Sequence, residues 1–340
     1  MIDKKAEVII KRTREVGKTY GFRSDYNPRL PADYWFQNPI EGLLLFVVFY
    51  TQACRWAKCL GCNLPSQVSQ EHVCYRDILK QIDFVFFNVL SSEHKQQLRK
   101  IIVSNNGSVL DQHTFSTTAL FYFITKMNLF CPNIAVLTLE TRPEYVQVSE
   151  LELLARAMKE GDTPTTLELA IGFEAFDEKT RNEHFVKGLS LDVFEKFATD
   201  CAQYNHRLKT YFMLKPIPGL SEQDAIDDIV DAIKYLDSIS KKLSTARRRF
   251  EVNMHLNPTY AARGTPLEQA FHAGDFIPPT LESVRQAVLA AEDSSISIYV
   301  GLNDEGLAVE GGSFIRPGDE ELVACLEEFN RTQDFSVLKS

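Results

Sequence analysis

Short apolar segments alternate with amphipathic, helix-like segments along the chain, and this alternation limits the possible folds more than any other feature. Six segments read as β-strands, at residues 43–50, 100–104, 134–139, 166–171, 208–214 and 250–256. A weaker seventh candidate lies at 295–300. Between the strands, 190–206 and 221–239 each begin with a serine followed by acidic residues, as helix N-termini prefer. The pattern predicts an α/β fold built on a parallel sheet or barrel.

The residues that follow each of the six strands are rich in glycine, proline, charged and amide side chains. They occupy positions 51–54, 105–111, 140–144, 172–176, 215–219 and 257–258. In α/β barrels, the carboxyl ends of the strands build the active site. Because six such ends occur in series and the first leads into a group of cysteines, the sequence predicts that they converge on one shared site.

Three of the seven cysteines fall within nine residues, with the spacing Cys54-x4-Cys59-x2-Cys62. The chain shows neither the apolar core of a signal peptide nor an apolar run of the roughly 20 residues that a membrane span needs. We therefore expect a cytoplasmic protein with no membrane association, in which thiols stay reduced. A metal or redox role then fits the cysteines better than disulfide bonds.

Three kinds of metal site are compatible with these thiols. Zinc would need a fourth ligand, and Cys74 and His72 are near in sequence, but Cys74 is expected on the apolar face of a helix. A two-iron site of the plant ferredoxin type would need Cys131, Cys201 or Cys325 as its fourth ligand. A four-iron cluster held by only three cysteines would leave one iron open to a small molecule.

The cysteine spacing and five later segments resemble radical S-adenosylmethionine (SAM) enzymes, in particular the branch of the Elongator catalytic subunit and the archaeosine synthase radical SAM subunit. The segments are SNNGSVLD (104–111), LETRPEYV (139–146), IGFEAFDEKTRNEHFVKGLSLDVF (171–194), YFMLKPIPGLSEQDAIDD (211–228) and NPTYAARGTPLEQAFHAGDFIPP (257–279). The chain departs from the family at Gly61, where an aromatic residue is common, and at Val109, where phenylalanine is usual.

The resemblance implies a partial (β/α)6 barrel of the TIM type over residues 35–320. An N-terminal helical or extended segment at 1–34 and a C-terminal helix and tail at 321–340 would flank this core.

The resemblance also implies two cofactors and an electron donor. A [4Fe-4S] cluster would be bound by Cys54, Cys59 and Cys62, and SAM would bind to its open iron. A protein of the flavodoxin or ferredoxin type would supply the electron that cleaves SAM and generates a 5′-deoxyadenosyl radical.

Polar residues at the strand ends are the SAM contacts that the resemblance implies. Gly107 would let the backbone approach SAM closely. Glu140 would accept hydrogen bonds from ribose hydroxyls or the SAM ammonium, and Arg142 would pair with a carboxylate. The full set is Ser104, Asn106, Gly107, Ser108, Glu140, Arg142, Glu174, Lys215 and Asn257. No residue is assigned to a catalytic hydrogen transfer.

The substrate class comes from the resemblance alone. Similarity to the archaeosine-type proteins implies modification of a 7-deazaguanine-type nucleoside in tRNA. The formal net charge is −9, unlike the basic footprint of most nucleic-acid binders, so tRNA binding would need a basic partner protein. The alternatives are a radical SAM enzyme that acts on a small molecule or peptide, and a non-catalytic iron–sulfur or zinc protein.

Overall fold

A single eight-stranded sheet organises the molecule in the computed structural model, which describes residues 4–339. The strands are β1 (Asp33–Gln37), β2 (Leu44–Val48), β3 (Lys100–Ser104), β4 (Val136–Thr141), β5 (Thr166–Glu174), β6 (Arg207–Leu214), β7 (Val252–Pro258) and β8 (Ser297–Val300). Their order in the sheet is their order in the chain. β1 pairs antiparallel with β2, and every later neighbouring pair is parallel. With β1 and β8 as its two edges, the sheet forms an open, partial barrel.

The predicted α/β fold with a partial barrel is confirmed, and all seven strand candidates are present as β2–β8. β4, β5 and β7 continue beyond their predicted ends, to Thr141, Glu174 and Pro258, because these residues still pair with a neighbouring strand. The sequence did not predict β1, which is a short and partly exposed edge strand. The predicted boundaries near residues 34 and 320 stay a prediction.

Ten α-helices connect or flank the strands in the described part of the chain. They are α1 (Lys4–Glu15), α2 (Tyr75–Phe84), α3 (Ser92–Gln97), α4 (Thr117–Phe130), α5 (Val148–Ala157), α6 (Leu191–Gln203), α7 (Glu222–Leu243), α8 (Pro266–Ala273), α9 (Leu281–Leu289) and α10 (Glu320–Thr332). The predicted starts of α6 and α7 are confirmed, because the hydroxyls of Ser190 and Ser221 accept hydrogen bonds from the first-turn backbone. None of the helices within residues 4–339 is long and apolar enough to cross a membrane.

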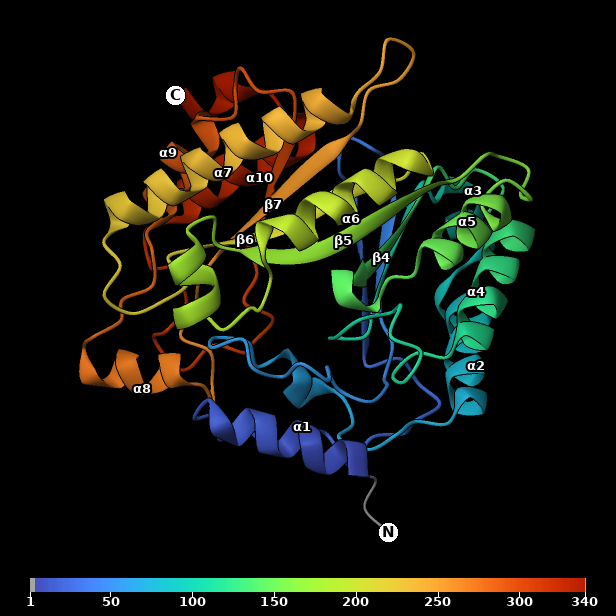
Figure 1. Cartoon of the computed structure of the whole chain (residues 1–340), viewed down its shortest axis with the longest axis horizontal. Helices are drawn as coiled ribbons and strands as arrows, with labels where there is room; N and C mark the ends of the chain where they lie inside the picture. The colour runs from blue at the N-terminus through green and yellow to red at the C-terminus, as the bar shows by residue number, and fades with distance from the viewer. Residues whose placement is uncertain (1–3, 340) are drawn as a thin grey trace.

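One face of the sheet is apolar and packs against the helices, which form an outer row in Figure 1. Successive side chains of a strand point to opposite faces, so alternate residues belong to this layer. Examples that are fully buried are Val47, Ile101, Val103, Leu137, Leu139, Leu169, Leu208, Met254 and Leu256. This layer forms the hydrophobic core of the molecule.

The remaining residues of the same strands point to the opposite, concave face, and this face is polar. Lys100, Glu168, Lys209, Tyr211 and His255 all belong to this set, and all are buried or nearly so. Lys100 Nζ lies 3.1 Å from Glu168 Oε1 inside the sheet. The inner face is therefore polar and charged, unlike the apolar interior of many α/β barrels.

The loop that carries the cysteines follows β2, at the carboxyl edge of the parallel strands. In Figure 1, this blue segment lies in the space between the curved sheet and α1, and α1 lies on the opposite side of the molecule from α7. The N-terminal helix and the strand ends thus approach the cysteine loop from two sides.

Candidate iron–sulfur and cofactor site

The cysteine loop, residues 54–62, is fastened to distant parts of the chain by backbone and side-chain hydrogen bonds. Trp56 Nε1 donates to the Val186 carbonyl at 2.9 Å, and the Leu60 amide donates to the Phe185 carbonyl at 2.8 Å. Just after the loop, the side-chain amide of Asn63 donates to the carbonyls of residues 263 and 307, at 3.2 Å and 3.0 Å. The loop therefore has a defined conformation.

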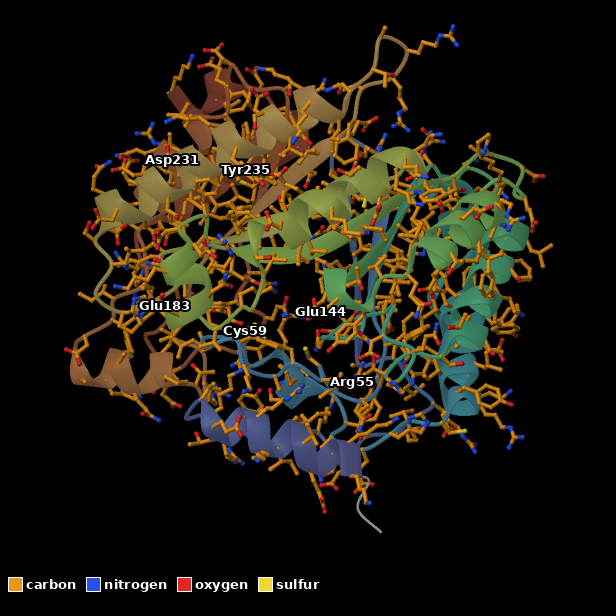
Figure 2. All side chains as sticks on the ribbon, in the orientation of Figure 1. Arg55, Cys59, Glu144, Glu183, Asp231 and Tyr235 are labelled. Carbon is orange, nitrogen blue, oxygen red and sulfur yellow. The ribbon has the colours of Figure 1, made fainter. Side chains whose placement is uncertain are left out.

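All three cysteines of the loop are partly buried free thiols. Burial raises the pKa of Cys62 to about 12, against the opposing charge of Lys18, and the nearby Cys59 and Cys54 raise it further. Figure 2 shows Cys59 in the region between α1 and the sheet. Within residues 4–339, no three His, Cys, Asp or Glu side chains are placed so that they could hold a single metal ion together. A multi-iron cluster binds each thiolate through a different iron, so its ligands need not share one ion.

The other four cysteines lie elsewhere. The prediction that Cys74 lies on an apolar helix face is wrong: it is exposed, because α2 begins one residue later and leaves it at the capping position. Cys131 and Cys201 are buried within the helix layer, at the end of α4 and inside α6. Cys325 lies in α10, where its thiol donates to the Val337 carbonyl at 3.3 Å.

The segment after β3 packs directly against the first cysteine. A Cβ atom on Gly107 would lie 3.1 Å from the Cys54 Cα and 3.2 Å from its backbone nitrogen. Asn106 donates from its side-chain amide to the Leu64 carbonyl at 3.2 Å, which ties this segment to the end of the cysteine loop. The glycine thus allows a close approach between two loops of the site, which a larger residue would disturb.

We expect the substitution Gly107→Ala to lower the iron content of the protein, because the added methyl group would push the Cys54 backbone out of place. Gly21→Ala is the matched control, since a Cβ atom there meets no atom within 4 Å. Iron determination on both variants after anaerobic reconstitution checks the prediction. Equal iron in Gly107→Ala and Gly21→Ala would contradict it.

Ser104 and Ser108, both buried, link the ends of neighbouring strands. The Ser108 and Thr141 hydroxyls are 2.6 Å apart, and the Arg142 amide donates to the Ser108 hydroxyl at 3.3 Å. Ser104 is a hydrogen-bond partner of the Glu140 carboxylate. The β3 and β4 strand ends therefore form one connected polar surface.

Glu140 lies in β4 and Arg142 in the turn that follows this strand, and the two side chains have different partners. The Tyr211 hydroxyl donates to Glu140 Oε1 at 2.5 Å. Burial raises the pKa of Glu140, while the hydrogen bonds from Ser104 and Tyr211 act in the opposite direction. The Glu140 carboxylate thus lies on the concave face and already accepts hydrogen bonds from two hydroxyls.

The Arg142 side chain lies beside the cysteine loop. Its guanidinium is 4.7 Å from the Trp56 ring centroid, donates to the Lys187 carbonyl at 2.9 Å and pairs with Glu144 at 2.5 Å. Burial alone would lower the pKa of Arg142, but the thiols of the loop and Glu144 outweigh it and raise the pKa. Arg142 therefore contributes positive charge next to the thiols.

The remaining predicted contacts divide into two groups. Glu174 Oε1 accepts a hydrogen bond from Lys187 Nζ at 2.8 Å, and Lys187 is buried near Cys59, so this pair belongs to the cysteine side of the site. Lys215 Nζ pairs with Glu222 at 2.8 Å, at the start of α7. Asn257 lies at the end of β7, where a Cβ atom on the neighbouring Gly301 would come within 2.2 Å of its Oδ1. Lys215 and Asn257 thus belong to the far strands of the open barrel.

Several residues of the site were not among the predictions. Arg55 forms a two-pronged ion pair with Asp111, with N···O distances of 2.5 and 2.8 Å, and so joins the cysteine loop to the segment after β3. Asp111 ends the SNNGSVLD segment and Lys187 lies in the Val-Lys-Gly turn, so both were visible within the matched motifs. Tyr211 begins the matched segment 211–228 and was visible there as well.

Gly61 has a structural reason for lacking a side chain. A Cβ atom there would lie 2.5 Å from Leu267 Cδ1 and 3.7 Å from the Phe185 ring. Leu267, at the start of α8, therefore fills the space that a side chain at position 61 would need.

Two curated relatives are similar to nearly the whole chain. Archaeosine synthase subunit beta of Methanosarcina acetivorans is 26% identical over 316 residues, which cover 89% of this chain and 84% of the relative. The protein of the same name from Thermococcus kodakarensis is 22% identical over 312 residues, which cover 88% of each. No family model matches the chain.

Among solved structures, Streptococcus suis SuiB bound to S-adenosylmethionine is 12% identical, with a TM-score of 0.48, over 83% of this chain and 55% of that one. The archaeal Elp3 of Methanocaldococcus infernus is 14% identical, with a TM-score of 0.47, over 68% of this chain and 53% of that one. Both relatives match most of this chain, and the chain thus resembles archaeosine synthase subunit beta, as its ordered motifs predicted.

Proposed function

We propose that this chain is a radical SAM enzyme that modifies a 7-deazaguanine-type nucleoside in tRNA. The observation that carries the proposal is the cysteine loop itself: three free thiols on nine residues, held at the carboxyl edge of a parallel sheet. The relatives, both named as subunits of archaeosine synthase, favour the same activity.

The residues of the loop fit a [4Fe-4S] cluster bound by Cys54, Cys59 and Cys62. Thiolates are the usual ligands of iron–sulfur clusters, and three of them leave one iron for SAM. The buried Tyr20 hydroxyl, which has no hydrogen-bond partner within residues 4–339, adds an available donor next to these thiols. When bound, the cluster supplies the electron that cleaves SAM to methionine and a 5′-deoxyadenosyl radical, which takes a hydrogen atom from the substrate.

The polar strand ends would bind and orient SAM. In this proposal the Glu140 carboxylate accepts hydrogen bonds from ribose hydroxyls or the SAM ammonium, and Arg142 attracts the SAM carboxylate. Ser104, Asn106 and Ser108 offer further polar contacts, and the buried sheet behind them keeps water away from the reacting atoms. Glu174, Lys215 and Asn257 would contact SAM or the substrate from the later strands.

Binding of tRNA would depend on a partner protein in the cytoplasm. The net charge is −9, and the densest run of basic residues, Arg247–Arg249, precedes β7. That position is at the amino end of the parallel strands, away from the cysteine loop. A basic partner would therefore bring tRNA to the site, and a flavodoxin- or ferredoxin-type protein would supply the electron.

Anaerobic reconstitution with iron and sulfide, followed by an assay for 5′-deoxyadenosine, tests the proposal. We expect SAM and a strong reductant to yield 5′-deoxyadenosine, and tRNA carrying the modified base to increase the yield. If small molecules or peptides stimulated turnover and tRNA did not, the proposed substrate class would be wrong. Reconstituted protein that binds iron or zinc but does not cleave SAM would exclude the enzyme altogether.

We expect Glu140→Gln and Arg142→Met to weaken SAM binding by roughly ten- to a hundred-fold while the cluster is retained, because each removes a charge-assisted hydrogen bond worth about 1.5–3 kcal/mol. Calorimetric SAM titration of iron-loaded protein measures the effect. Glu195→Gln on α6 and Arg285→Met on α9 are matched controls in the helix layer. Unchanged dissociation constants with lowered melting temperatures would show that Glu140 and Arg142 only support the fold.

A further inference from the structure

The N-terminal segment, residues 4–20, forms hydrogen bonds and an ion pair with the part of the cysteine loop between Cys54 and Cys59. The Arg12 guanidinium donates to the Arg55 carbonyl, and Lys18 Nζ donates to the Ala57 carbonyl at 2.9 Å. The Glu15 carboxylate pairs with Lys58 Nζ at 3.0 Å. Two residues near the end of α1 and Lys18 just beyond it therefore contact a stretch of four loop residues, which the barrel core contacts from the other side.

Lys18 carries a positive charge into the interior. The residue is 1% exposed, and its ammonium group is held by the Ala57 carbonyl. Ala57 has a φ of 58°, a left-handed conformation that is unfavourable for an alanine. Its carbonyl belongs to the loop between Cys54 and Cys59, so the hydrogen bond brings the charge of Lys18 to the loop that carries the thiols. Its charge therefore lies beneath the loop and close to the thiols.

Tyr20 places an unsatisfied donor beside the same thiols. The residue is 8% exposed, and its hydroxyl is buried without a hydrogen-bond partner within residues 4–339. Its backbone is fixed, since the Thr19 amide donates to the Gly264 carbonyl at 2.8 Å and a Cβ atom on Gly264 would lie 2.7 Å from the Tyr20 Cβ. Tyr20 and Asn63, the residue after the third cysteine, line one pocket of about 430 Å³.

Leaving a buried hydroxyl without a partner is unfavourable, so such a group is expected to have a partner in the complete site. The thiols of Cys54, Cys59 and Cys62 all act on the Tyr20 hydroxyl, after burial the main reason that its pKa is raised. Since Tyr20 shares a pocket with Asn63, which follows Cys62 directly, we infer that a sulfur atom held by the loop is this partner.

We propose that Lys18 and Tyr20 raise the reduction potential of the iron–sulfur cluster, and that the N-terminal segment is a working part of the site. This inference rests on the proposed function, since it concerns the group that the three thiols would hold. Reduction adds negative charge to a cluster. A buried positive charge and a hydrogen bond to sulfur both stabilise the reduced form, and the low dielectric of the interior strengthens both effects.

A redox titration of the full-length, reconstituted protein, followed by electron paramagnetic resonance, tests the inference. We expect Lys18→Gln and Tyr20→Phe each to shift the cluster potential to more negative values, with iron content and melting temperature near those of the unchanged protein. Lys18→Gln keeps a donor for the Ala57 carbonyl and removes only the charge. Lys18→Arg keeps the charge and should retain the original potential.

Two controls remove the same groups at exposed positions. Lys11→Gln removes a lysine charge from α1, where the side chain is 77% exposed, and Tyr34→Phe removes an exposed hydroxyl. Both should leave the potential unchanged.

Four results would overturn the inference. They are an unchanged potential in both iron-loaded variants, an equal shift in Lys18→Gln and Lys18→Arg, equal shifts in the exposed controls, and loss of iron from both Lys18→Gln and Tyr20→Phe. If the unchanged protein assembled no SAM-responsive cluster, the proposed function would fail, and this inference with it. If the unchanged protein had a normal cluster and the variants had the same reduction potential, this inference would be wrong while the proposed function would stand.

Discussion

Replacing Cys54, Cys59 or Cys62 by alanine is expected to remove most of the bound iron from the reconstituted protein, because a cluster with two protein ligands is held too weakly to survive purification. Adding SAM to the reduced, unchanged protein should alter the electron paramagnetic resonance spectrum, since one iron lacks a protein ligand. Iron analysis and spectroscopy under anaerobic conditions measure both effects.

Cys74→Ala is the control for these variants, and its iron content should stay that of the unchanged protein. Cys74 is an exposed residue ahead of α2, and it is the cysteine nearest in sequence to the loop. If Cys74→Ala lost as much iron as Cys62→Ala, the site would have four cysteine ligands. The open iron, and with it the role of SAM, would then have to be abandoned.

The second large effect should come from the charged inner face of the sheet. Lys100 is 4% exposed and pairs with Glu168 at 3.1 Å and with Glu41 at 2.8 Å. Glu168 is buried as well and also accepts a hydrogen bond from the Thr138 hydroxyl at 2.8 Å. Lys100→Met would leave a buried carboxylate without its main cation, and we expect it to lower the free energy of unfolding by about 3–5 kcal/mol.

Denaturant unfolding followed by circular dichroism measures this loss. Lys196→Met is the matched control, because Lys196 also pairs with a carboxylate, that of Asp200 at 2.6 Å, but its side chain is 71% exposed. An exposed pair is worth about 0–1 kcal/mol. Similar losses in the two variants would mean that the inner ion pair is screened by solvent and does not stabilise the barrel.

The strands were predictable because each is a short apolar run that ends at glycine, proline or polar residues, as in KIIVS before Asn105. The same reasoning located the cysteine loop at a strand end. It could not find β1, since Asp33–Gln37 is a strand only because β2 offers it a free edge. Nor could it place Cys74, because one residue decides whether a thiol faces the core or caps the helix.

The partners of the site residues were beyond prediction for a different reason. Arg142 meets Trp56 and the Lys187 carbonyl because three loops converge at the strand ends, and local sequence does not encode that convergence. The polar inner face of the sheet could not be predicted from the sequence either. In a parallel sheet both faces are buried, so Lys209 and Tyr211 read as interruptions of an apolar strand rather than as a second, polar layer.

The fastening of the cysteine loop has a consequence for the order of events during synthesis. The Trp56 side chain donates a hydrogen bond to a carbonyl 130 residues further along the chain, and the Asn63 side chain donates to carbonyls 200 and 244 residues further along. Such distant pairings form late, because the intervening chain must first be ordered. The three thiols are made early but reach their final arrangement only when Leu307 has been added and the last strands have docked. If the thiols hold the proposed cluster, its insertion would therefore follow translation, and a nascent chain stalled before that residue would expose its cysteines to oxidation and to stray metal ions.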